Sequence, residues 1–442
     1  MNYPRFFAGF AQDRIFGGAV VLALTQFGAS LAGLIRDRVL TTTFPRLGVV
    51  DVYIASFRPS DLLFQVTIMA GFSVALVPLL ARYKAENKPR QMSDLLSGVT
   101  GAAAIVFGLL ALLLAVFFPW IAPHMTNFEG EALKLYIDFG RIALLTNFLF
   151  VFGNAFGQYL ITIQKYWIYG LTPILYTLGT IFGALFLTES YGAYGPIFGT
   201  LGGAIIYVLL RLIALLRSNY RPGFMIWHPE IRELGWLMLP RMLALGALQL
   251  ELLFFDKIAS GLGSGAVTVN AYARNFQSVV IGVAGIALAQ SAFSLLSQAA
   301  AKKEGKRFWI YVQKGSLILL GMTIPGAIAL YYLAPVAADL VNLESELALF
   351  SAVLGIYAIS IPFESLNHLL LRAFYAVKDT LVPAGLSALN GIVAIAIALI
   401  LAPRYGVLSL AAAFTVGQII QLIGLGILLP IRARNLRFRK NS

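Results

Sequence analysis

The stretch GVVDVYIASFRPSDLLFQVTIMAGFSVALVPLLAR, residues 48–82, decides the fold. It is long enough to cross a bilayer, since about 20 apolar residues span about 30 Å of hydrocarbon. Its first half nevertheless carries Asp51, Arg58 and Asp61. Ionisable groups inside a membrane span are costly and tend to face a bundle interior or a water-filled cavity. The stretch therefore predicts a membrane helix with a functional polar side.

A second stretch, GAVTVNAYARNFQSVVIGVAGIALAQSAFSLLSQAAAKK (residues 265–303), repeats this layout, with Arg274 in the place of Arg58. Gly265 follows Gly48 by 217 residues, close to half of the 442-residue chain. Because each half holds six spans, equivalent helices cross in the same direction, which is a parallel repeat. The predicted domains are a six-helix bundle at 1–217, a cytoplasmic linker at 218–233 and a second bundle with a basic tail at 234–442.

The predicted fold is an all-α polytopic membrane protein with a central cavity between its two halves, and composition supports the membrane class. The chain is 59% hydrophobic and 12% charged, whereas soluble proteins approach 25% charged residues. Twelve spans are predicted, near 16–35, 55–82, 96–120, 133–160, 167–187, 194–216, 234–258, 267–297, 309–334, 346–374, 383–402 and 407–431. The absence of Cys excludes disulfides and thiolate metal sites. No nucleotide-binding or hydrolytic motif is present, so a transporter is predicted rather than an enzyme.

The distribution of Lys and Arg predicts the topology. The net charge of +13 comes mostly from loops that follow even-numbered spans and from the C-terminal tail. By the positive-inside rule both termini are expected in the cytoplasm. This topology explains the basic charge without a nucleic-acid partner. No cleavable signal peptide is visible at the N-terminus.

Charged residues concentrate in spans one, two, seven and eight, which are equivalent positions in the two halves. Arg58 and Arg274 are predicted to line a cavity between the halves, because both halves place an Arg at nearly the same depth. Glu251, near the middle of span seven, is the predicted coupling acid. Helix-end pairing is the alternative for Arg36 with Asp37 and for Asp256, and reaching the membrane surface is the alternative for Arg241. Arg211 is expected to be such a surface anchor.

The segments GLIRDRVLTTTF (33–44), DVYIASFRPSDLL (51–63), FSVALVPLLARY (72–83), GSGAVTVNAYARNFQSVVIGVAGIAL (263–288) and RAFYAVKDTLVP (372–383) resemble the MurJ/MviN-type lipid II flippases. These belong to the multidrug/oligosaccharidyl-lipid/polysaccharide (MOP) exporter superfamily, whose fold is two six-helix bundles. The resemblance implies transport of the undecaprenyl-diphosphate-linked peptidoglycan precursor across the bacterial cytoplasmic membrane by alternating access. Cell-wall synthesis proteins are the partners that it implies.

The resemblance also implies roles for individual residues. Arg36 and Asp37 match an Arg-Asp pair at the end of span one, Asp51 an acid that opens span two, and Arg58 a basic position within it. With Arg241 and Arg274, which are predicted from their place within the spans, the substrate-binding set is Arg36, Asp37, Asp51, Arg58, Arg241 and Arg274. Some family members bind Na⁺ through spans seven and eleven, so the candidates for a coupling ion, Na⁺ or H⁺, are Glu251, Asp256 and Asn390. The chain departs from the family at Ser30, Phe64, Gln65 and Asn275, and lacks its last two spans.

Two further functions remain open from the residues. A cation-coupled exporter of small amphipathic compounds, on the same fold, would depend on the acids rather than on the arginines. The same fold would also suit a flippase for another polyprenyl-linked saccharide. A non-transporting scaffold for a cell-wall synthesis complex is the reading from another class, motivated by the basic tail.

Overall fold

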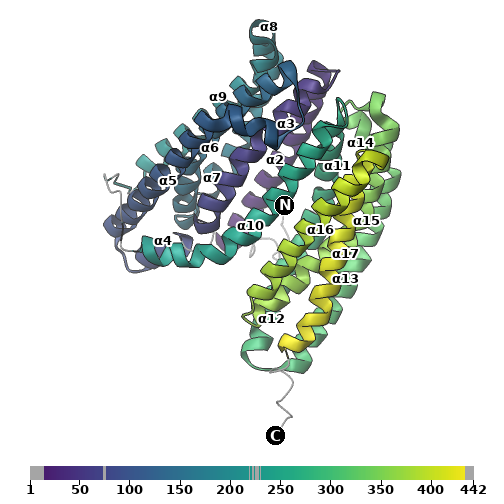
Figure 1. The fold of residues 1–442 in the computed structure, drawn as a ribbon. Helices are drawn as coiled ribbons and strands as arrows, with labels where there is room; N and C mark the ends of the chain where they lie inside the picture. The colour runs from purple at the N-terminus through teal and green to yellow at the C-terminus, as the bar shows by residue number, and fades with distance from the viewer. Residues whose placement is uncertain are drawn as a thin grey trace, which may run out of the picture. The chain divides into compact units, whose positions relative to one another are not determined.

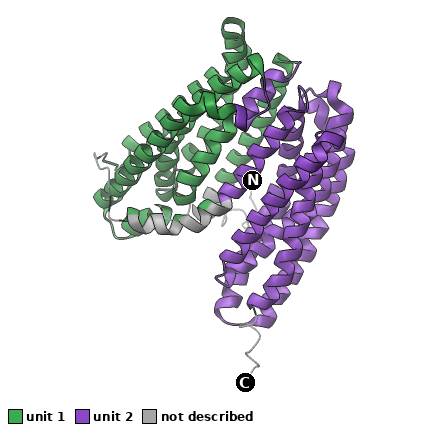
Figure 2. Ribbon diagram, viewed as in Figure 1, with its two compact units in different colours: residues 1–45, 56–122, 129–242 green, residues 46–55, 123–128, 243–442 purple. Residues whose placement is uncertain are grey.

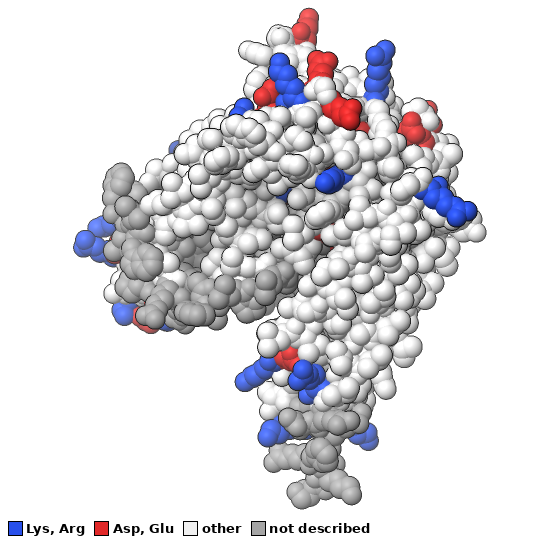
Figure 3. Space-filling model, in the orientation of Figure 1, with Lys and Arg blue, Asp and Glu red and all other residues white. Residues whose placement is uncertain are grey.

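The computed structural model describes residues 14–72, 76–218, 220, 221, 223, 228 and 230–433, without the side chains of 14–19, 232–237, 239–241, 243 and 244. Within these residues the chain is helical and contains no strand (Figure 1). Nine helical stretches of the described part are long and apolar enough to cross a membrane, and one of them, Tyr166–Leu216, contains two long helices. The predicted all-α polytopic class is confirmed. On the face in Figure 3, most charged side chains lie near helix ends.

The chain forms two compact units (Figure 2). Unit 1 comprises residues 1–45, 56–122 and 129–242, and unit 2 comprises residues 46–55, 123–128 and 243–442. Helices α3 and α10 contribute residues to both units. The domain boundaries drawn from the sequence repeat, at 217 and 234, stay a prediction.

The helices up to residue 216 are α2 (Arg14–Thr43), α3 (Gly48–Phe64), η1 (Gln65–Met69), α4 (Val77–Ala85), α5 (Pro89–Met125), α6 (Gly130–Thr162), α7 (Tyr166–Phe182), η3 (Gly183–Leu187), α8 (Thr188–Tyr191), η4 (Gly192–Tyr194) and α9 (Gly195–Leu216). The later ones are α10 (Ile231–Ser260), α11 (Ala266–Val280), η5 (Ile281–Ile286), α12 (Ala287–Ala301), α13 (Gly305–Tyr332), α14 (Ala334–Leu340), η6 (Glu344–Glu346), α15 (Leu347–Ala376), α16 (Leu381–Tyr405) and α17 (Leu408–Arg432).

An aromatic cluster organises the core of unit 1. The ring of Phe64, at the end of α3, lies edge-on to Phe107 of α5 and Phe150 of α6, with centroid distances of 5.9 Å and 6.5 Å. Phe150 also contacts Tyr176 of α7 and Tyr207 of α9. Edge-to-face aromatic pairs of this kind add about 0.5–1.5 kcal/mol beyond their buried area. The cluster therefore joins α3, α5, α6, α7 and α9 around one core.

Helices α7 and α9 approach each other closely through glycines. A Cβ built on Gly179 would lie 2.6 Å from the carbonyl oxygen of Gly199 and 2.6 Å from the Cα of Gly203. Small residues at helix interfaces permit such backbone contact in membranes, where packing replaces the hydrophobic effect as the force between helices. The contact of Gly179 with Gly199 and Gly203 therefore fixes the separation of α7 and α9.

Arg211 does not anchor α9 at a membrane surface, and that prediction is wrong. Its side chain is 1% exposed. The guanidinium donates hydrogen bonds to the hydroxyl of Thr172 (2.8 Å) and to the carbonyl oxygens of Gly153 (2.7 Å) and Tyr169 (2.8 Å). It also lies over the rings of Tyr169 and Tyr207, 4.8 Å and 4.2 Å from their centroids. Hydrogen bonds and ring faces together stabilise a cation that would otherwise be costly to bury.

Helix α15 is the centre of unit 2. It packs against α11, α12, α13 and α17. Leu369 and Phe374 of α15 share one buried cluster with Phe308 of α13, Leu296 of α12 and Leu425 of α17. Side chains on α15 are therefore placed by packing on several sides.

The two related stretches share one irregularity. Helix α3 passes into the π-helical segment η1, and α11 passes into the π-helical segment η5. The two segments occupy equivalent places in the repeat. Single π-turns inside α-helices occur frequently at functional sites.

We expect Gly179→Ala to destabilise the protein, because the added methyl group would meet the backbone of α9. Overpacking of this kind costs about 1–3 kcal/mol. Gly202→Ala, in α9, is the matched control, since a Cβ there meets nothing within 4 Å. Thermal unfolding of both purified variants measures the difference. Equal melting temperatures would show that the α7–α9 separation is not fixed by this contact.

Candidate functional site

Unit 1 contains a polar cluster between α3 and α6. Asn147 of α6 donates a hydrogen bond from its side-chain nitrogen to the carboxylate of Asp61 at 2.9 Å and contacts the hydroxyl of Ser60. Ser60 in turn donates to the carbonyl oxygen of Ala143 at 3.0 Å. Arg58, one turn before Asp61, interacts electrostatically with that carboxylate. An arginine, an acid, an amide and a hydroxyl are thus held together on two helices.

Unit 2 contains the equivalent cluster between α11 and α15. Gln277 of α11 donates from its side-chain nitrogen to the carboxylate of Glu364 at 2.7 Å and to the hydroxyl of Ser360 at 3.0 Å, both on α15. Arg274, one turn before Gln277, interacts electrostatically with Glu364. The hydroxyl of Tyr357 donates to Asn270 at 2.8 Å and ties the same two helices together nearby.

The two clusters have the same chemistry with the roles exchanged. Gln277 follows Ser60 by 217 residues, which is the offset of the repeat. In unit 1 the acid is on the second-span helix and the amide on its partner, whereas in unit 2 the amide is on α11 and the acid on α15. In both arrangements a carboxylate accepts a hydrogen bond from an amide, and an arginine lies one turn before the cluster's residue on the same helix. Both units therefore join the equivalent helix pair by an amide–carboxylate hydrogen bond, although the residues at each position differ.

Arg274 has a second acidic partner. Its guanidinium lies 3.6 Å from the carboxylate of Glu251 on α10, and it stacks over the ring of Phe414 at 4.4 Å. The side chain of Glu251 is 3% exposed and that of Arg274 is 18% exposed. The arginine is therefore held among two acids and a ring, yet part of it remains accessible.

Arg36 and Asp37 form an ion pair on α2 of unit 1. The guanidinium of Arg36 reaches the carboxylate of Asp37 at 2.6 Å, and the side chains are 28% and 6% exposed. The predicted pair thus forms, and the guanidinium keeps an exposed part. Its binding role stays a prediction.

Asp51 caps a helix. Its carboxylate accepts hydrogen bonds from the backbone N–H of Gly265 (2.6 Å), from that of Thr268 (2.8 Å) and from the hydroxyl of Thr268 (2.5 Å). These groups form the start of α11, where backbone N–H groups have no partner within the helix. Asp51 is 1% exposed. Its position therefore serves the fold directly, and its predicted contact with substrate stays untested.

The remaining predicted residues are Asp256, Asn390 and Arg241, and Asp256 interacts electrostatically with Asp51. Asp256 is 3% exposed. Asn390 donates to the side-chain oxygen of Gln421 at 3.0 Å, and a Cβ on neighbouring Gly391 would lie 3.9 Å from the carboxylate of Glu251. The side chain of Arg241 lies outside the described residues. Among the described residues, no three His, Asp or Glu side chains gather as metal ligands do.

Sequence reasoning missed the hydrogen-bonding partners of the acids. Asn147, Gln277 and Ser360 are buried, and none of them was selected as a site residue. Glu364 lies in the predicted span 346–374 and was not selected as a site residue either. An alignment of the repeat places Ser60 opposite Gln277, and the change from hydroxyl to amide at that position is the signal that could have found them.

The described helices are long enough to cross a membrane, and each of the two units holds an arginine beside a carboxylate that accepts a hydrogen bond from an amide. This combination is that of a polytopic membrane transporter. The family model described as lipid II flippase MurJ matches residues 40–440. The chain belongs to this family.

Relatives and solved structures agree with that assignment. The chain is 24% identical to a probable lipid II flippase MurJ of Bdellovibrio bacteriovorus over 439 residues, which covers 94% of this chain and 82% of the relative. It is 25% identical to one of Thermotoga maritima over 415 residues, covering 90% and 82%.

In fold, the chain is similar to a lipid II flippase MurJ in an inward closed conformation, with a TM-score of 0.78, 20% identity and coverage of 95% and 89%. It is also similar to an inward-facing multidrug resistance MATE transporter of the MOP superfamily, with a TM-score of 0.77, 15% identity and coverage of 93% and 96%. The predicted superfamily fold is confirmed.

We expect Asp51→Ala to destabilise the protein, because two backbone N–H groups and a hydroxyl at the start of α11 would lose their acceptor. Loss of a helix cap costs about 0.5–2 kcal/mol. Thermal unfolding measures the change, and Glu344→Ala, at an exposed acid of unit 2, is the control. Unchanged stability together with lost substrate binding would instead assign Asp51 to the substrate.

Proposed function

We propose that this protein transports lipid II, the undecaprenyl-diphosphate-linked peptidoglycan precursor, across the bacterial cytoplasmic membrane by alternating access. The observation that carries the proposal is the family match over residues 40–440, almost the whole chain. Two relatives that match over most of their length are named as lipid II flippases. No covalent bond changes in this transport, so the proposal assigns no catalytic residue.

The proposed topology places both termini in the cytoplasm, supported by the basic loops after even-numbered spans. Cell-wall synthesis proteins are the proposed partners, because they make the precursor on one side of the membrane and consume it on the other.

Arg58 and Arg274 are the proposed contacts for the diphosphate. Each lies one turn from a cluster that fixes its helix against a neighbour, so each guanidinium is presented from a rigid position. A guanidinium offers several N–H donors in a plane, a geometry that matches phosphate oxygens. The partial exposure of Arg274 leaves room for such a contact. Arg36 is proposed to add a third positive charge.

The charges of unit 2 support a coupling ion. Arg274 carries one positive charge, and Glu251 and Glu364 carry two negative charges when both are ionised. A diphosphate approaching Arg274 would then meet a site of net charge −1. Uptake of one cation by an acid removes this repulsion. We propose that this cation is H⁺, with Na⁺ as the alternative. The proposed acceptor is Glu251, because its carboxylate contacts Arg274 directly.

We expect Arg58→Ala and Arg274→Ala each to weaken lipid II binding about tenfold or more, since a charged hydrogen bond contributes about 1.5–3 kcal/mol. Binding to purified protein and transport in vesicles are the measurements. Arg307→Ala is the control, because that guanidinium is 63% exposed and pairs only locally with Glu304. Undiminished binding and transport in the double variant would refute the proposal.

We expect lipid II binding to be accompanied by proton uptake and to strengthen as pH falls, because protonation of an acid removes a negative charge from the site. Calorimetry in two buffers with different ionisation enthalpies measures the protons taken up. Glu251→Gln should reduce that number, and Glu344→Gln should not. A requirement for Na⁺ with no proton uptake would assign the coupling to Na⁺ instead.

One observation favours a second function. Two acids for one arginine in unit 2 would suit a cationic amphipathic compound, and the fold is also that of a MATE transporter. A cationic dye and lipid II, compared on the same protein, separate the two functions. Dye binding that is lost in Glu251→Gln, without preference for lipid II, would favour the exporter.

A further inference from the structure

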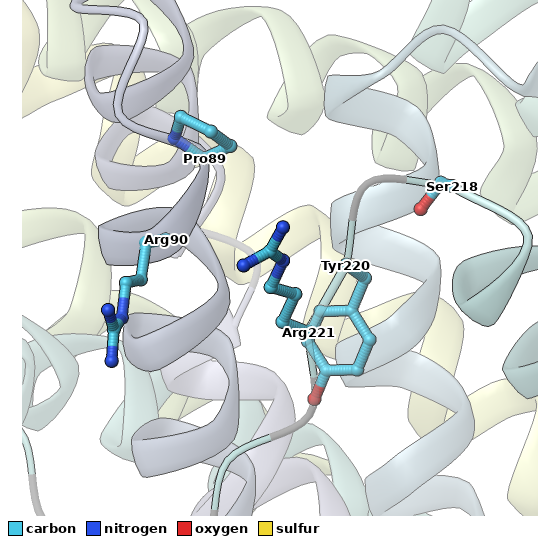
Figure 4. Close-up of a pocket in the computed structure, with 5 residues that line it drawn as sticks. All are labelled: Pro89, Arg90, Ser218, Tyr220 and Arg221. Carbon is cyan, nitrogen blue, oxygen red and sulfur yellow. The ribbon is translucent and has the colours of Figure 1, made fainter.

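A cavity of about 550 Å³ lies at one end of unit 1, away from the polar cluster of α3 and α6 in sequence. It is lined by Pro89 and Arg90 at the start of α5 and by Ser218, Tyr220 and Arg221, which follow α9 (Figure 4). This volume is within the range of small-molecule sites. Nothing in the proposed transport mechanism uses these residues.

The wall after α9 is held firmly against α5. The backbone N–H of Arg221 donates to the hydroxyl of Ser93 at 3.2 Å, and that of Gly223 donates to the hydroxyl of Ser97 at 3.2 Å. The hydroxyl groups of Ser97 and Tyr220 are 3.0 Å apart. Tyr220 also packs edge-on against Tyr159. Ser93, Ser97 and the ring of Tyr220 thus hold the backbone around Arg221 in place.

The cavity has an excess of positive charge. Figure 4 shows the guanidinium of Arg221 between the start of α5 and Tyr220, while Arg90 extends outward from α5. Neither side chain forms an ion pair with a described residue. The acid Asp94 is also near, since a Cβ on Gly223 would lie 3.8 Å from its carboxylate, but the described lining residues themselves carry two cations and no anion.

Neighbouring basic residues already have acidic partners. Arg82 pairs with Glu230, and Lys88 pairs with Glu86. Arg90 and Arg221, by contrast, have no acidic partner among the described residues, so their charges are available to a ligand in the cavity. Burial raises the pKa of the Tyr220 hydroxyl, so the hydroxyl stays protonated at neutral pH and does not add a negative charge to the wall.

We propose that this cavity binds the phosphate group of a ligand, with Arg221 as the direct contact and Arg90, which extends outward from α5, as a more distant positive charge. A guanidinium donates two parallel hydrogen bonds to phosphate oxygens, and a firmly held backbone limits the entropy lost when the ligand binds. The phosphate could belong to an anionic lipid headgroup or to a soluble molecule, and both offer the same oxygens. The site is separate from the transport of lipid II.

The test uses the full-length purified protein and two probes. Native mass spectrometry measures retention of phosphatidylglycerol against phosphatidylcholine, and calorimetry measures binding of inorganic phosphate. Retention of phosphatidylglycerol alone assigns the site to a lipid headgroup, and binding of inorganic phosphate assigns it to a soluble ligand. Either result supports a phosphate site when it depends on Arg221.

We expect Arg221→Gln to weaken phosphate binding about tenfold, and Arg90→Gln to weaken this binding less. Arg217→Gln is the matched control, because Arg217 also follows α9, is exposed and does not line the cavity. Arg221→Gln behaving as the unmodified protein with both probes would overturn the proposal. So would an equal loss in Arg217→Gln, since the effect would then be general attraction to a basic surface. An unchanged melting temperature verifies that each variant is folded.

Discussion

The structure depends on satisfying carboxylates inside an apolar helix bundle. Water is scarce there, so an ionised acid needs donors from the protein. Asp61 obtains one from Asn147, and Glu364 obtains one from Gln277. Each hydrogen bond also fixes two long helices at one height, because donor and acceptor are on different helices. The same hydrogen bonds also position the arginines one turn away. The contacts that hold the helices together therefore also place the candidate binding groups.

The exchange of amide and acid between the repeats has a consequence for charge. Unit 1 pairs Arg58 with Asp61, which is neutral as a pair. Unit 2 adds Glu251 from α10 to the pair of Arg274 and Glu364, and its cluster is negative when both acids are ionised. Two halves with the same architecture therefore differ in electrostatics.

The sequence was sufficient to predict the all-helical membrane fold and the repeat, because span length and charge scarcity depend only on composition along the chain. It also singled out Arg58 and Arg274, since the two stretches place an Arg ten and nine residues after their opening glycines; their role in binding stays a prediction. It could not identify Asn147 or Gln277, whose role depends on which helix faces them. Arg211 was predicted wrongly because closeness to a helix end does not reveal Gly157, which leaves space for its guanidinium, or Gly153, which leaves space for the ring of Tyr207.

The π-helical segments give the clusters a mechanical setting. η1 begins four residues after Asp61, and η5 begins four residues after Gln277. A π-turn interrupts the regular i to i−4 hydrogen bonds of an α-helix and is a common site of bending. Each arginine and its cluster thus lie on a regular helical segment that ends at a weak point. The helix beyond this turn can therefore change direction while the cluster keeps its geometry.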